Sequence, residues 1–593
     1  MDHPPSPKVP SKFILHFTLK ISNWTPDSMA SLQLISEDDG PNNNVAVHVH
    51  ATDAASTGNI IGKHTEKTDV KDSDDEESGD KDSENEDPDN EDSDDEDSDD
   101  EDSDDEDSDD EDANDEARVP GGDDLTELPF RVTLTGPPKL STKLQEKAMF
   151  WGYLGYRHCI DPLWKIDISV ELIKETVRPY MRLCGLPSEG FDVEFLAEGR
   201  WNRVYTISAL KDGVVKECIF RLALPDFPWY RTQIEVSTME FIRHHTSIPV
   251  PRIYAFNSSM KSPLGLEWIL MEKVQGRTYA DAAWSLSFET RTNIHRKVAD
   301  WVDELSRIEF DQIGSLYHDW SKPLSDRRAY FVGPLNEEEF KSDLRLDHKV
   351  YRGPFTSMQQ LTSSRIAFPM AEALDPRMEE RAKYCQAKEK AKEDGDDTFK
   401  IDEDLEVISD PEYTLEVLKR IPGYCMELQS ILPIVFAGER IGVPGHYRLA
   451  HIDIHYQNIM VDDAGNAVAL LDWEQTMTMP LEWTPVYPKL VDTNEYDKPE
   501  PWTIIGPRNE QQAEEEDDYE HYLLRFEFEK RLKELDSPLL GHKADCTDLQ
   551  TIENHLEMMH RACMDDDSDE DEVFVLRVKA RARKAFANSV GIA

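Results

Sequence analysis

Residues 451–474 read HIDIHYQNIMVDDAGNAVALLDWE and hold two short apolar runs around a polar centre. The runs over 458–461 and 467–471 have the length and composition of short β-strands. Residues 462–466 are typical of a tight turn, because Asp, Asn and Gly favour turn conformations. The segment is therefore predicted to form a β-hairpin.

The polar residues at the open end of this hairpin indicate phosphate chemistry. Gly465 is the midpoint between Asn458 and Asp472, so an antiparallel register places these two residues opposite each other. An amide oxygen and a carboxylate that face one point suit Mg²⁺, which prefers hard oxygen ligands. Asp453, five residues before Asn458, can lie beside that ion and accept the proton of a hydroxyl. These spacings are those of a kinase catalytic loop, with Asp472 where the metal-binding Asp of D-F-G would be.

The alternative is an ordinary hairpin in which Asp and Asn serve only as turn formers. That interpretation accounts for residues 462–466. It does not account for Asp453, Asn458 and Asp472, which lie outside the turn at spacings that converge on the strand ends. The pattern therefore favours phosphate transfer over a purely structural hairpin.

The charge of the chain restricts its partners. The 593 residues carry a formal net charge of −57, and residues 71–118 hold 31 acidic side chains against three basic ones. The rest of the chain is also acidic, which argues against binding to nucleic acids or anionic membranes, because both require Lys and Arg patches. Seven scattered cysteines without a C-x-x-C pair predict a reducing compartment. We therefore expect a cytoplasmic location, with a nuclear one as the alternative.

The acidic segment contains a short repeat. Residues 91–112 repeat E-D-S-D-D, with Ser93, Ser98, Ser103 and Ser108 at a period of five. This period fits neither a helix nor a strand, and the tract has no apolar residue to bury, so it is predicted to be disordered. A solvating tail is the simple interpretation, and a phosphorylatable tail that attracts basic proteins is the alternative.

After residue 190 the pattern changes first to strands and then to helices. The expected strands cover 204–207, 218–222, 253–256 and 266–271, and a helix is expected over 231–245. Helical periodicity dominates beyond Gly276. Strands followed by helices predict an α+β fold with two lobes.

We divide the chain into five segments at the changes in composition and periodicity. They are a disordered acidic arm (1–125), a helical extension (126–190), a strand-rich nucleotide lobe (191–275), a helical lobe with the catalytic loop (276–535) and a charged C-terminal tail (536–593).

A kinase also needs donors over the nucleotide phosphates, a cation that binds them and an acid that holds this cation. Residues 197–205, AEGRWNRVY, are a candidate phosphate-covering turn, although a plain hairpin turn explains them almost as well because Gly199 is the only glycine. Arg221 ends an apolar strand and is the candidate cation, since a guanidinium binds phosphate through two hydrogen bonds. Glu235 in the next helix is its candidate partner, with a solvated helix residue as the alternative. Glu272 follows a strand and would offer backbone groups to an adenine.

Further motifs follow one another along the chain. They are G-x-x-N-x-V-Y, F-R-L, E-V-S-T-M-E-F-I-R, I-P-V-P, I-L-M-E-x-V-x-G, R-G-P-F-T-S, H-x-D-x-H-x-x-N and L-D-W-E. In this order they resemble the aminoglycoside phosphotransferase and choline kinase superfamily, in particular fungal proteins with an aminoglycoside phosphotransferase domain. The resemblance covers about residues 190–530.

The resemblance implies a protein-kinase-like fold that uses ATP and Mg²⁺. The implied catalytic base is Asp453, and the implied metal ligands are Asn458 and Asp472. The implied nucleotide-binding residues are Gly199, Asn202, Arg221, Glu235 and Glu272. His451 and His455 are expected to orient the loop.

The catalytic loop departs from the family pattern H-G-D-x-H-x-G-N at two positions. Ile452 replaces the small glycine, and Gln457 precedes Asn458. A bulky residue beside Asp453 is expected to alter the loop, since glycine relieves steric limits there. The main hypothesis is an ATP-dependent phosphotransferase that acts on a hydroxyl of a small molecule. The alternatives are a pseudokinase scaffold and an acidic binder of basic proteins.

Overall fold

The structure is a computed structural model of the chain, which divides into two compact units, 1–108 and 109–593. The described residues are 16–18, 31–33, 48–50, 130–131, 136–154, 159–395, 400, 411–491, 510–541, 547–560 and 568–589. The first unit contributes a small antiparallel sheet of β1 (His16–Thr18), β2 (Ser31–Gln33) and β3 (His48–His50). These three strands are the described part of the predicted arm over 1–125; the serine repeat over 91–112 and the prediction made for it lie outside the described residues.

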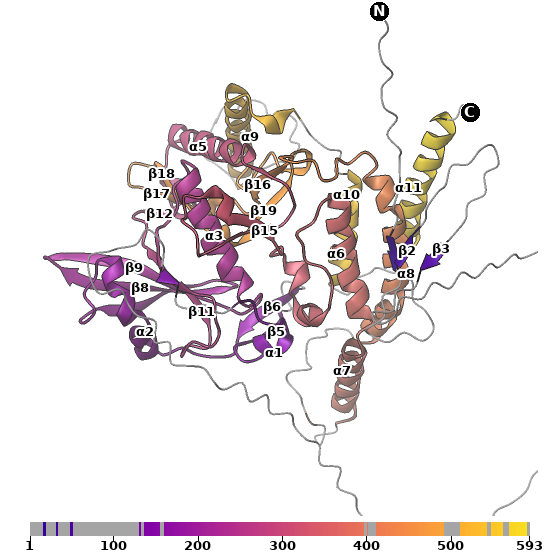
Figure 1. Ribbon diagram of the computed structural model, residues 1–593, viewed down its shortest axis with the longest axis horizontal. Coiled ribbons are helices and arrows are strands. Elements are labelled where there is room, and N and C mark those ends of the chain that lie inside the picture. The colour runs from indigo at the N-terminus through magenta and orange to yellow at the C-terminus, as the bar shows by residue number, and fades with distance from the viewer. Residues whose placement is uncertain are drawn as a thin grey trace, which may run out of the picture. The chain divides into compact units, whose positions relative to one another are not determined.

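The second unit is an α+β fold with two lobes, and its strand-rich lobe is built on one six-stranded sheet. The strands follow the order β4-β10-β11-β9-β8-β7 and are antiparallel, except that β4 pairs in parallel with β10. They are β4 (Phe130–Arg131), β7 (Asp192–Glu198), β8 (Asn202–Lys211), β9 (Val214–Ala223), β10 (Ile253–Asn257) and β11 (Glu267–Glu272). The long β8–β9 hairpin projects from the sheet in Figure 1. All four strands predicted from the sequence are confirmed.

The two faces of the sheet carry different side chains, because successive residues of a strand point to opposite faces. Phe220 and Trp268 face a buried apolar cluster closed by helix α2 (Val170–Val177) and 3₁₀ helix η1 (Arg178–Cys184). Arg221, the next residue of β9, faces the opposite side, towards helix α3. Strand β9 therefore directs Arg221 towards the second lobe.

Helix α3 (Tyr230–His245) joins the sheet to the second lobe and contacts β10, β14 and the 3₁₀ turn η8 (Figure 1). Glu267 of β11 takes the place of a helix cap, because its carboxylate accepts a hydrogen bond from the N–H of Trp229. Trp229 has a φ of 72°, which is uncommon for a bulky residue. Burial raises the pKa of Glu267 to about 8. This contact fixes the start of α3, and with it the side chains that α3 sends into the site.

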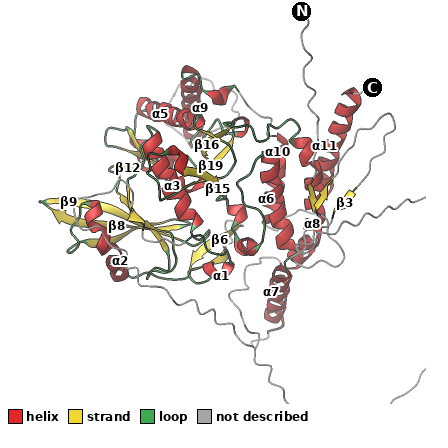
Figure 2. Ribbon diagram, in the orientation of Figure 1, coloured by secondary structure: helices red, strands yellow, loops and turns green. Residues whose placement is uncertain are grey.

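The second lobe is mostly helical, as Figure 2 shows. Its helices are α4 (Tyr279–Ala282), α5 (Phe288–Ser306), α6 (Met358–Ala373), α7 (Pro376–Asp394), α8 (Pro411–Val435) and α9 (Glu510–Glu534). Its strands form small sheets: β12 (Arg277–Thr278), β17 (Ile459–Val461) and β18 (Ala467–Leu470); β13 (Glu309–Phe310), β16 (Tyr447–His451) and β19 (Thr476–Pro480); β14 (Ser315–His318) and β15 (Tyr330–Gly333). Across the described residues, no helix is long and apolar enough to cross a membrane.

One apolar cluster is shared by the two lobes. It contains Phe241 of α3, Ile269 of β11, Trp301 of α5 and Trp473 after β18, all almost fully buried. Burial of each such side chain contributes roughly 1.5–3 kcal/mol or more. The β17–β18 hairpin therefore rests on the same core as α3 and the six-stranded sheet.

The extension over 126–190 is not simply helical, which corrects the prediction. Besides short helix α1 (Thr142–Gln145), it contains an antiparallel hairpin of β5 (Met149–Leu154) and β6 (Cys159–Trp164). Aromatic residues such as Trp151 dominate this hairpin, and aromatic side chains favour strands when they can pack on a neighbouring surface. Here they pack next to the tip of the β7–β8 hairpin.

The segment over 536–593 is not a charged tail, which is a second correction. It contains helices α10 (Thr547–His560) and α11 (Ser568–Ser589). The prediction was wrong because it was based on the charge of the segment and not on the spacing of its apolar residues. Their apolar residues recur at helical spacing, which places Ile552 and Val575 in a buried cluster with α6 and α8.

We predict that Ile552→Ala lowers the free energy of unfolding by about 2–5 kcal/mol, because it leaves a cavity in this cluster. The matched control is Leu576→Ala on α11, whose side chain is 54% exposed and whose loss should change stability by no more than about 0.5 kcal/mol. Chemical denaturation of the full chain measures both. Equal, small effects of the two substitutions would show that α10 does not belong to the core.

Candidate active site

The hairpin predicted from the sequence is present. β17 pairs with β18, and the turn occupies residues 462–466. The pairing slips by one residue between Met460 and Val461, so β18 carries one residue more than a regular hairpin. The sequence pattern does not reveal this bulge, because it changes neither the composition nor the length of the apolar runs.

The register corrects the predicted pairing of Asn458 with Asp472, because Val461 pairs with Ala467 and the turn is therefore centred on Ala464 and not on Gly465; the bulge recovers only one residue of this offset. Asn458 lies opposite Leu471, whose N–H donates to the Asn458 carbonyl at 2.8 Å. Asp472 is the next residue and adopts a left-handed conformation with a φ of 61°. Such conformations are uncommon outside glycine and concentrate at functional sites. The chain turns here and enters η8 (Trp473–Gln475).

Asp453 lies in the loop between β16 and the hairpin and is held from several sides. Its carboxylate accepts a hydrogen bond from the Lys489 ammonium at 2.7 Å and lies 3.6 Å from Nε2 of His455. Its backbone N–H donates to Nδ1 of His451 at 3.2 Å, and its carbonyl accepts from the Asn458 amide at 2.9 Å. The loop conformation is therefore fixed, and Asn458 keeps its side-chain oxygen for another partner.

His451 couples this loop to the end of the hairpin. Because its Nδ1 accepts a hydrogen bond, its Nε2 carries the proton and donates to the Leu471 carbonyl at 3.0 Å. Burial lowers the pKa of His451 to about 4, which keeps the ring neutral. The ring also packs on Trp473 at 4.8 Å. This geometry matches the orienting function expected for His451, because it fixes Asp453 relative to the residue before Asp472.

The substitution at Ile452 does not strain the loop. The described residues with positive φ other than glycine are Asp212, Trp229, Asp343, Asp472 and Asp536, and Ile452 is not among them. Its side chain packs at the edge of the apolar cluster of α6 and α8. The expected distortion next to Asp453 is therefore absent, because this position does not need the conformational freedom of glycine.

Arg221 and Glu235 form the ion pair expected from the sequence. Both side chains are buried, and Arg221 also interacts electrostatically with Asp472 and Glu474. Burial lowers the pKa of Arg221. The cation on β9 thus lies close to the acid at the end of the hairpin, although the two are about 250 residues apart in sequence.

A second buried network was not predicted. Arg231 binds the Glu474 carboxylate through Nε at 2.8 Å and Nη2 at 2.7 Å, and its Nη1 donates to Asp226 at 3.0 Å. Lys341 binds Asp226 and also donates to the Asn336 side chain at 2.7 Å. The Asn336 amide donates to the Glu474 carbonyl at 3.0 Å, which closes a ring of five residues.

Two sequence signals could have revealed part of this network. Arg231 lies four residues before Glu235, so the two share one face of α3. Glu474 lies two residues after Asp472 in L-D-W-E. Nothing in the sequence points to Lys341 or its partners, because they come from an irregular segment.

The charges around Asp472 leave one negative charge without a partner. The buried carboxylates of Asp226, Glu235 and Glu474, together with the half-buried Asp472, outnumber the three cations Arg221, Arg231 and Lys341. Burial, followed by the nearby Glu474 carboxylate, raises the pKa of Asp472 to about 7, against the opposing effect of Arg221 and Arg231. One Asp472 oxygen, Oδ1, is buried without a hydrogen-bond partner.

This arrangement fits a divalent cation. A partnerless buried oxygen, an excess negative charge and the free oxygen of Asn458 are what a hard cation requires. Within the described ranges no group of three or more His, Cys, Asp or Glu could hold a metal alone. A Mg²⁺ ion bound here would therefore take further ligands from water or phosphate, as Mg²⁺ commonly does.

The predicted nucleotide turn lies at the tip of the β7–β8 hairpin. The Gly199 N–H donates to the Asn202 carbonyl at 2.9 Å, and Oδ1 of Asn202 is buried without a partner. A Cβ atom at Gly199 would meet nothing within 4 Å, so there is open space at this point of the turn. Glu272 ends β11, and its N–H and carboxylate both bond to the Arg252 backbone, so its N–H is already occupied.

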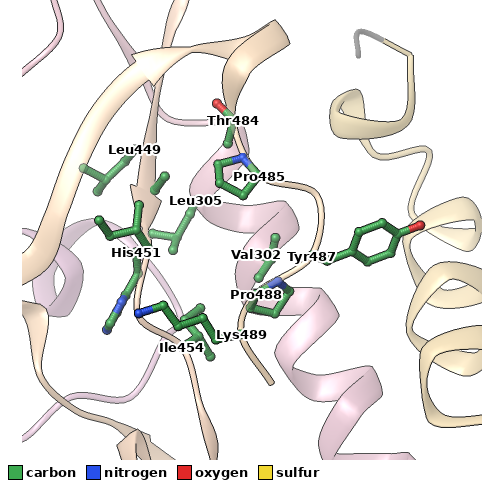
Figure 3. Close-up of a pocket in the computed structure, with 12 residues that line it drawn as sticks. Val302, Leu305, Leu449, His451, Ile454, Thr484, Pro485, Tyr487, Pro488 and Lys489 are labelled. Atoms are coloured by element: carbon green, nitrogen blue, oxygen red, sulfur yellow. The ribbon is translucent and has the colours of Figure 1, made fainter. Parts of the chain in front are cut away.

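A cavity of about 240 Å³ lies next to the catalytic loop, and the side chains in Figure 3 line it. It is bounded by Val302 of α5, by Leu449 of β16 and by the segment over 484–489, and most of these side chains are apolar. Tyr487 points away from it, towards α9, and donates to Glu529 at 2.9 Å. Asp453 does not line the cavity; Lys489 does.

Residues 192–362 match the model of the APH family, described as the phosphotransferase enzyme family. The resemblance predicted from the motifs is therefore confirmed for the strand-rich lobe and the start of the helical lobe. The matched segment contains Arg221 and Glu235 and ends before His451.

Curated relatives are fungal proteins. A subtelomeric hrmA-associated cluster protein of Aspergillus fumigatus is 32% identical over 169 residues, which cover 28% of this chain and 33% of that protein. Altered inheritance of mitochondria protein 9, mitochondrial, of Eremothecium gossypii is 25% identical over 356 residues and 54% of each chain. The match thus spans about a third of the length of the first relative.

The expectation of a cytoplasmic location is wrong by this comparison. Relatives from Yarrowia lipolytica, Eremothecium gossypii and Lachancea thermotolerans are named as mitochondrial proteins. The sequence argument failed because cysteine usage reports a reducing environment and does not distinguish between compartments that share it.

Solved structures include aminoglycoside phosphotransferase APH(4)-Ia, at 14% identity and a TM-score of 0.30, covering 70% of this chain and 99% of that one. Choline kinase from Cryptosporidium parvum has 13% identity and a TM-score of 0.31, covering 72% and 98%. Similarities of this size carry no argument about function.

We predict that Asp472→Asn makes the metal-free protein more stable at alkaline pH. The folded pKa of Asp472, about 7, is above its ordinary value of 3.8, so its contribution is present at low pH and is lost as the pH rises through about 7. Between pH 3.8 and about 7 the unfolded chain loses a proton that the folded chain keeps, so each pH unit in this window lowers the stability of the parent by about 1.4 kcal/mol at most, and above about pH 7 the loss stays constant. Thermal unfolding at pH 5 and pH 8 in a chelator measures the difference. The control is Asp463→Asn, an exposed residue of the same hairpin; equal behaviour of the two variants would contradict the assignment.

Proposed function

We propose that this chain is an ATP- and Mg²⁺-dependent phosphotransferase that acts on a hydroxyl of a small molecule. The observation that carries the proposal is the buried, partnerless oxygen of Asp472 beside the Arg221–Glu235 pair. A buried acid with this surplus charge destabilises the fold unless a ligand compensates it. The match of residues 192–362 to the phosphotransferase enzyme family supports the same reaction class.

Asp453 is proposed as the general base. Its carboxylate is mostly buried, with 14% of the side chain exposed, and its exposed partner Lys489 is the group that an acceptor can displace. A hydroxyl in the position of the Lys489 ammonium would lie within hydrogen-bond distance of Asp453 and could transfer its proton to the carboxylate during attack on phosphorus. The contacts to His451 and Asn458 keep Asp453 in place.

Asp472 and Asn458 are proposed as the metal ligands. Both lie at the open end of the β17–β18 hairpin, and each has a side-chain oxygen that the protein leaves available. Bound with ATP, Mg²⁺ would neutralise charge on the transferring phosphoryl group. Its binding would also offset the negative charge that raises the pKa of Asp472.

Arg221 is proposed to anchor nucleotide phosphates, with Glu235 fixing its guanidinium. The side of the sheet that carries Arg221 also presents Ile219, a partly buried side chain that offers an apolar contact for an adenine ring. Because the Glu272 N–H is already bonded, the link after β11 would contact the base through the residues that follow. Gly199 and Asn202 are proposed to lie over the phosphates.

We predict that ATP raises the melting temperature of the full chain only when Mg²⁺ is present. Asp472→Ala should remove this dependence on the metal, because it removes the proposed ligand. Differential scanning fluorimetry with millimolar nucleotide, with Mg²⁺ or with a chelator, measures the effect. If the parent shows no stabilisation by Mg²⁺ and ATP together, the proposal fails.

We predict that Asp453→Asn retains Mg²⁺-dependent ATP binding and loses about 10²- to 10⁴-fold in the rate of phosphate transfer, the usual effect of losing a general base. Slow ATP hydrolysis, with water as the acceptor, gives a readout before an acceptor is known. Calorimetric titration with ATP controls for binding. Full turnover by the Asn variant would refute the assignment of Asp453.

A further inference from the structure

The tip of the β7–β8 hairpin is tied to the rest of the molecule through Arg200. The guanidinium of Arg200 binds the Glu338 carboxylate with two hydrogen bonds, Nη1 to Oε2 at 2.8 Å and Nη2 to Oε1 at 2.6 Å. Its Nε donates to Asp161 of β6. Glu338 belongs to 3₁₀ helix η4 (Glu338–Phe340) of the second lobe. One arginine therefore links the proposed phosphate turn to the extension and to the other lobe.

The next residue, Trp201, places this arginine close to the charges around Asp472. Its ring has three cations near it: Arg200 at 4.8 Å, Lys341 at 5.0 Å and Arg231 at 5.6 Å from the ring centroid. Trp151 of the extension packs against the other part of the ring at 5.9 Å. Arg231 in turn binds Glu474, two residues after Asp472. The Arg200 guanidinium is thus held beside the proposed phosphate site.

Each of these cations has carboxylate partners, and the partners differ in exposure. Asp226 and Glu474, which bind Lys341 and Arg231, have side chains that are 0% and 4% exposed. Asp161 is 3% exposed, whereas Glu338 is 38% exposed. Separating a buried pair costs several kcal/mol, while an exposed pair contributes little. Glu338 is therefore the one carboxylate of this group that a soluble anion can replace at low cost.

We propose that Arg200 binds the phosphate groups of a nucleotide, and that Glu338 occupies this binding position in the nucleotide-free chain. This inference rests on the proposed nucleotide site and adds a residue to it. A phosphate presents oxygens in the same two-point geometry as a carboxylate and can take over both hydrogen bonds from Arg200. Asp161 and Trp201 keep the guanidinium in place during the exchange.

The replacement of Glu338 by a phosphate group on Arg200 also explains how a turn with a single glycine can bind phosphate. A glycine-rich loop binds phosphates with its backbone N–H groups, and here the Gly199 N–H is used within the turn. A fixed guanidinium supplies charged donors in its place. Release of Glu338 also frees the tip of the hairpin from the second lobe.

The test compares nucleotide affinity in the full chain. Glu338→Gln removes the competing charge and keeps the size of the side chain, so it should strengthen binding of ATP with Mg²⁺ by about two- to fivefold. Arg200→Gln should weaken it by about ten- to a hundredfold, since hydrogen bonds to a charged donor are lost. Adenosine should bind all variants equally, because it has no phosphate. Isothermal titration calorimetry measures each dissociation constant.

Arg178→Gln is the matched control. Arg178 belongs to η1 of the strand-rich lobe, lies outside the candidate phosphate turn over 197–205, and pairs with Glu189 at 3.3 Å at the surface. It should leave ATP affinity unchanged. Tripolyphosphate with Mg²⁺ is a second probe, and it should follow the same order among the variants as ATP if Arg200 contacts phosphate.

The outcomes separate the two proposals. If the parent binds ATP and Glu338→Gln leaves the affinity unchanged or lowers it, the assignment of Glu338 is wrong while the proposed function stands. If Arg178→Gln weakens binding as much as Arg200→Gln, the loss of affinity reflects the net charge of the lobe and the assignment of Arg200 is wrong. If the parent binds neither ATP nor tripolyphosphate, both proposals fail. Because Glu338 is partly exposed, its variant is expected to fold even if Arg200→Gln does not.

Discussion

The buried pair of Arg231 and Glu474 is the interaction on which the arrangement of the site depends. It joins helix α3 of the first lobe to the turn that follows Asp472, and both side chains are nearly inaccessible to water. Breaking such a pair leaves an uncompensated charge in the interior, which costs about 3–5 kcal/mol. α3 therefore cannot move away from the hairpin at low cost, and Glu235, one turn further along, stays near Asp472.

The same network makes Asp472 unusual. Arg221 and Arg231 are each engaged by other carboxylates, so neither fully compensates Asp472. The result is an acid with a raised pKa and a left-handed backbone, two features that cost stability. A loss of folding stability at such a residue is tolerated where a bound ligand offsets it. The proposed binding of metal and phosphate at Asp472 would supply that compensation.

Two peripheral regions, the extension before the sheet and helices α10 and α11, pack against the elements that carry the site. The extension before the sheet sends Trp151 and Asp161 to the tip of the β7–β8 hairpin, and α10 and α11 close the apolar cluster of α6 and α8. The charges of α10 and α11 concealed their apolar faces. A helix with one narrow apolar face can be packed firmly and still have the composition of a tail.

The sequence by itself determined the local elements and the pattern of the catalytic hairpin. Apolar alternation located the strands of the sheet, and the spacing of Asp453, Asn458 and Asp472 located the hairpin ends, because both depend on residues close in the chain. The pairing of Arg221 with Glu235 was also within reach, since a strand and the following helix pack together.

Only the tertiary structure decided the register of the hairpin, the partners of Arg231 and the position of Arg200. The centre of the turn at Ala464 and the one-residue bulge both leave the apolar pattern unchanged, so the sequence could not reveal that Asn458 faces Leu471. Glu474 and Arg231 are separated by 243 residues, and Glu338 and Arg200 by 138. Contacts over such distances depend on how the lobes pack, and a charged residue in a sequence carries no sign of whether its partner will be buried or exposed.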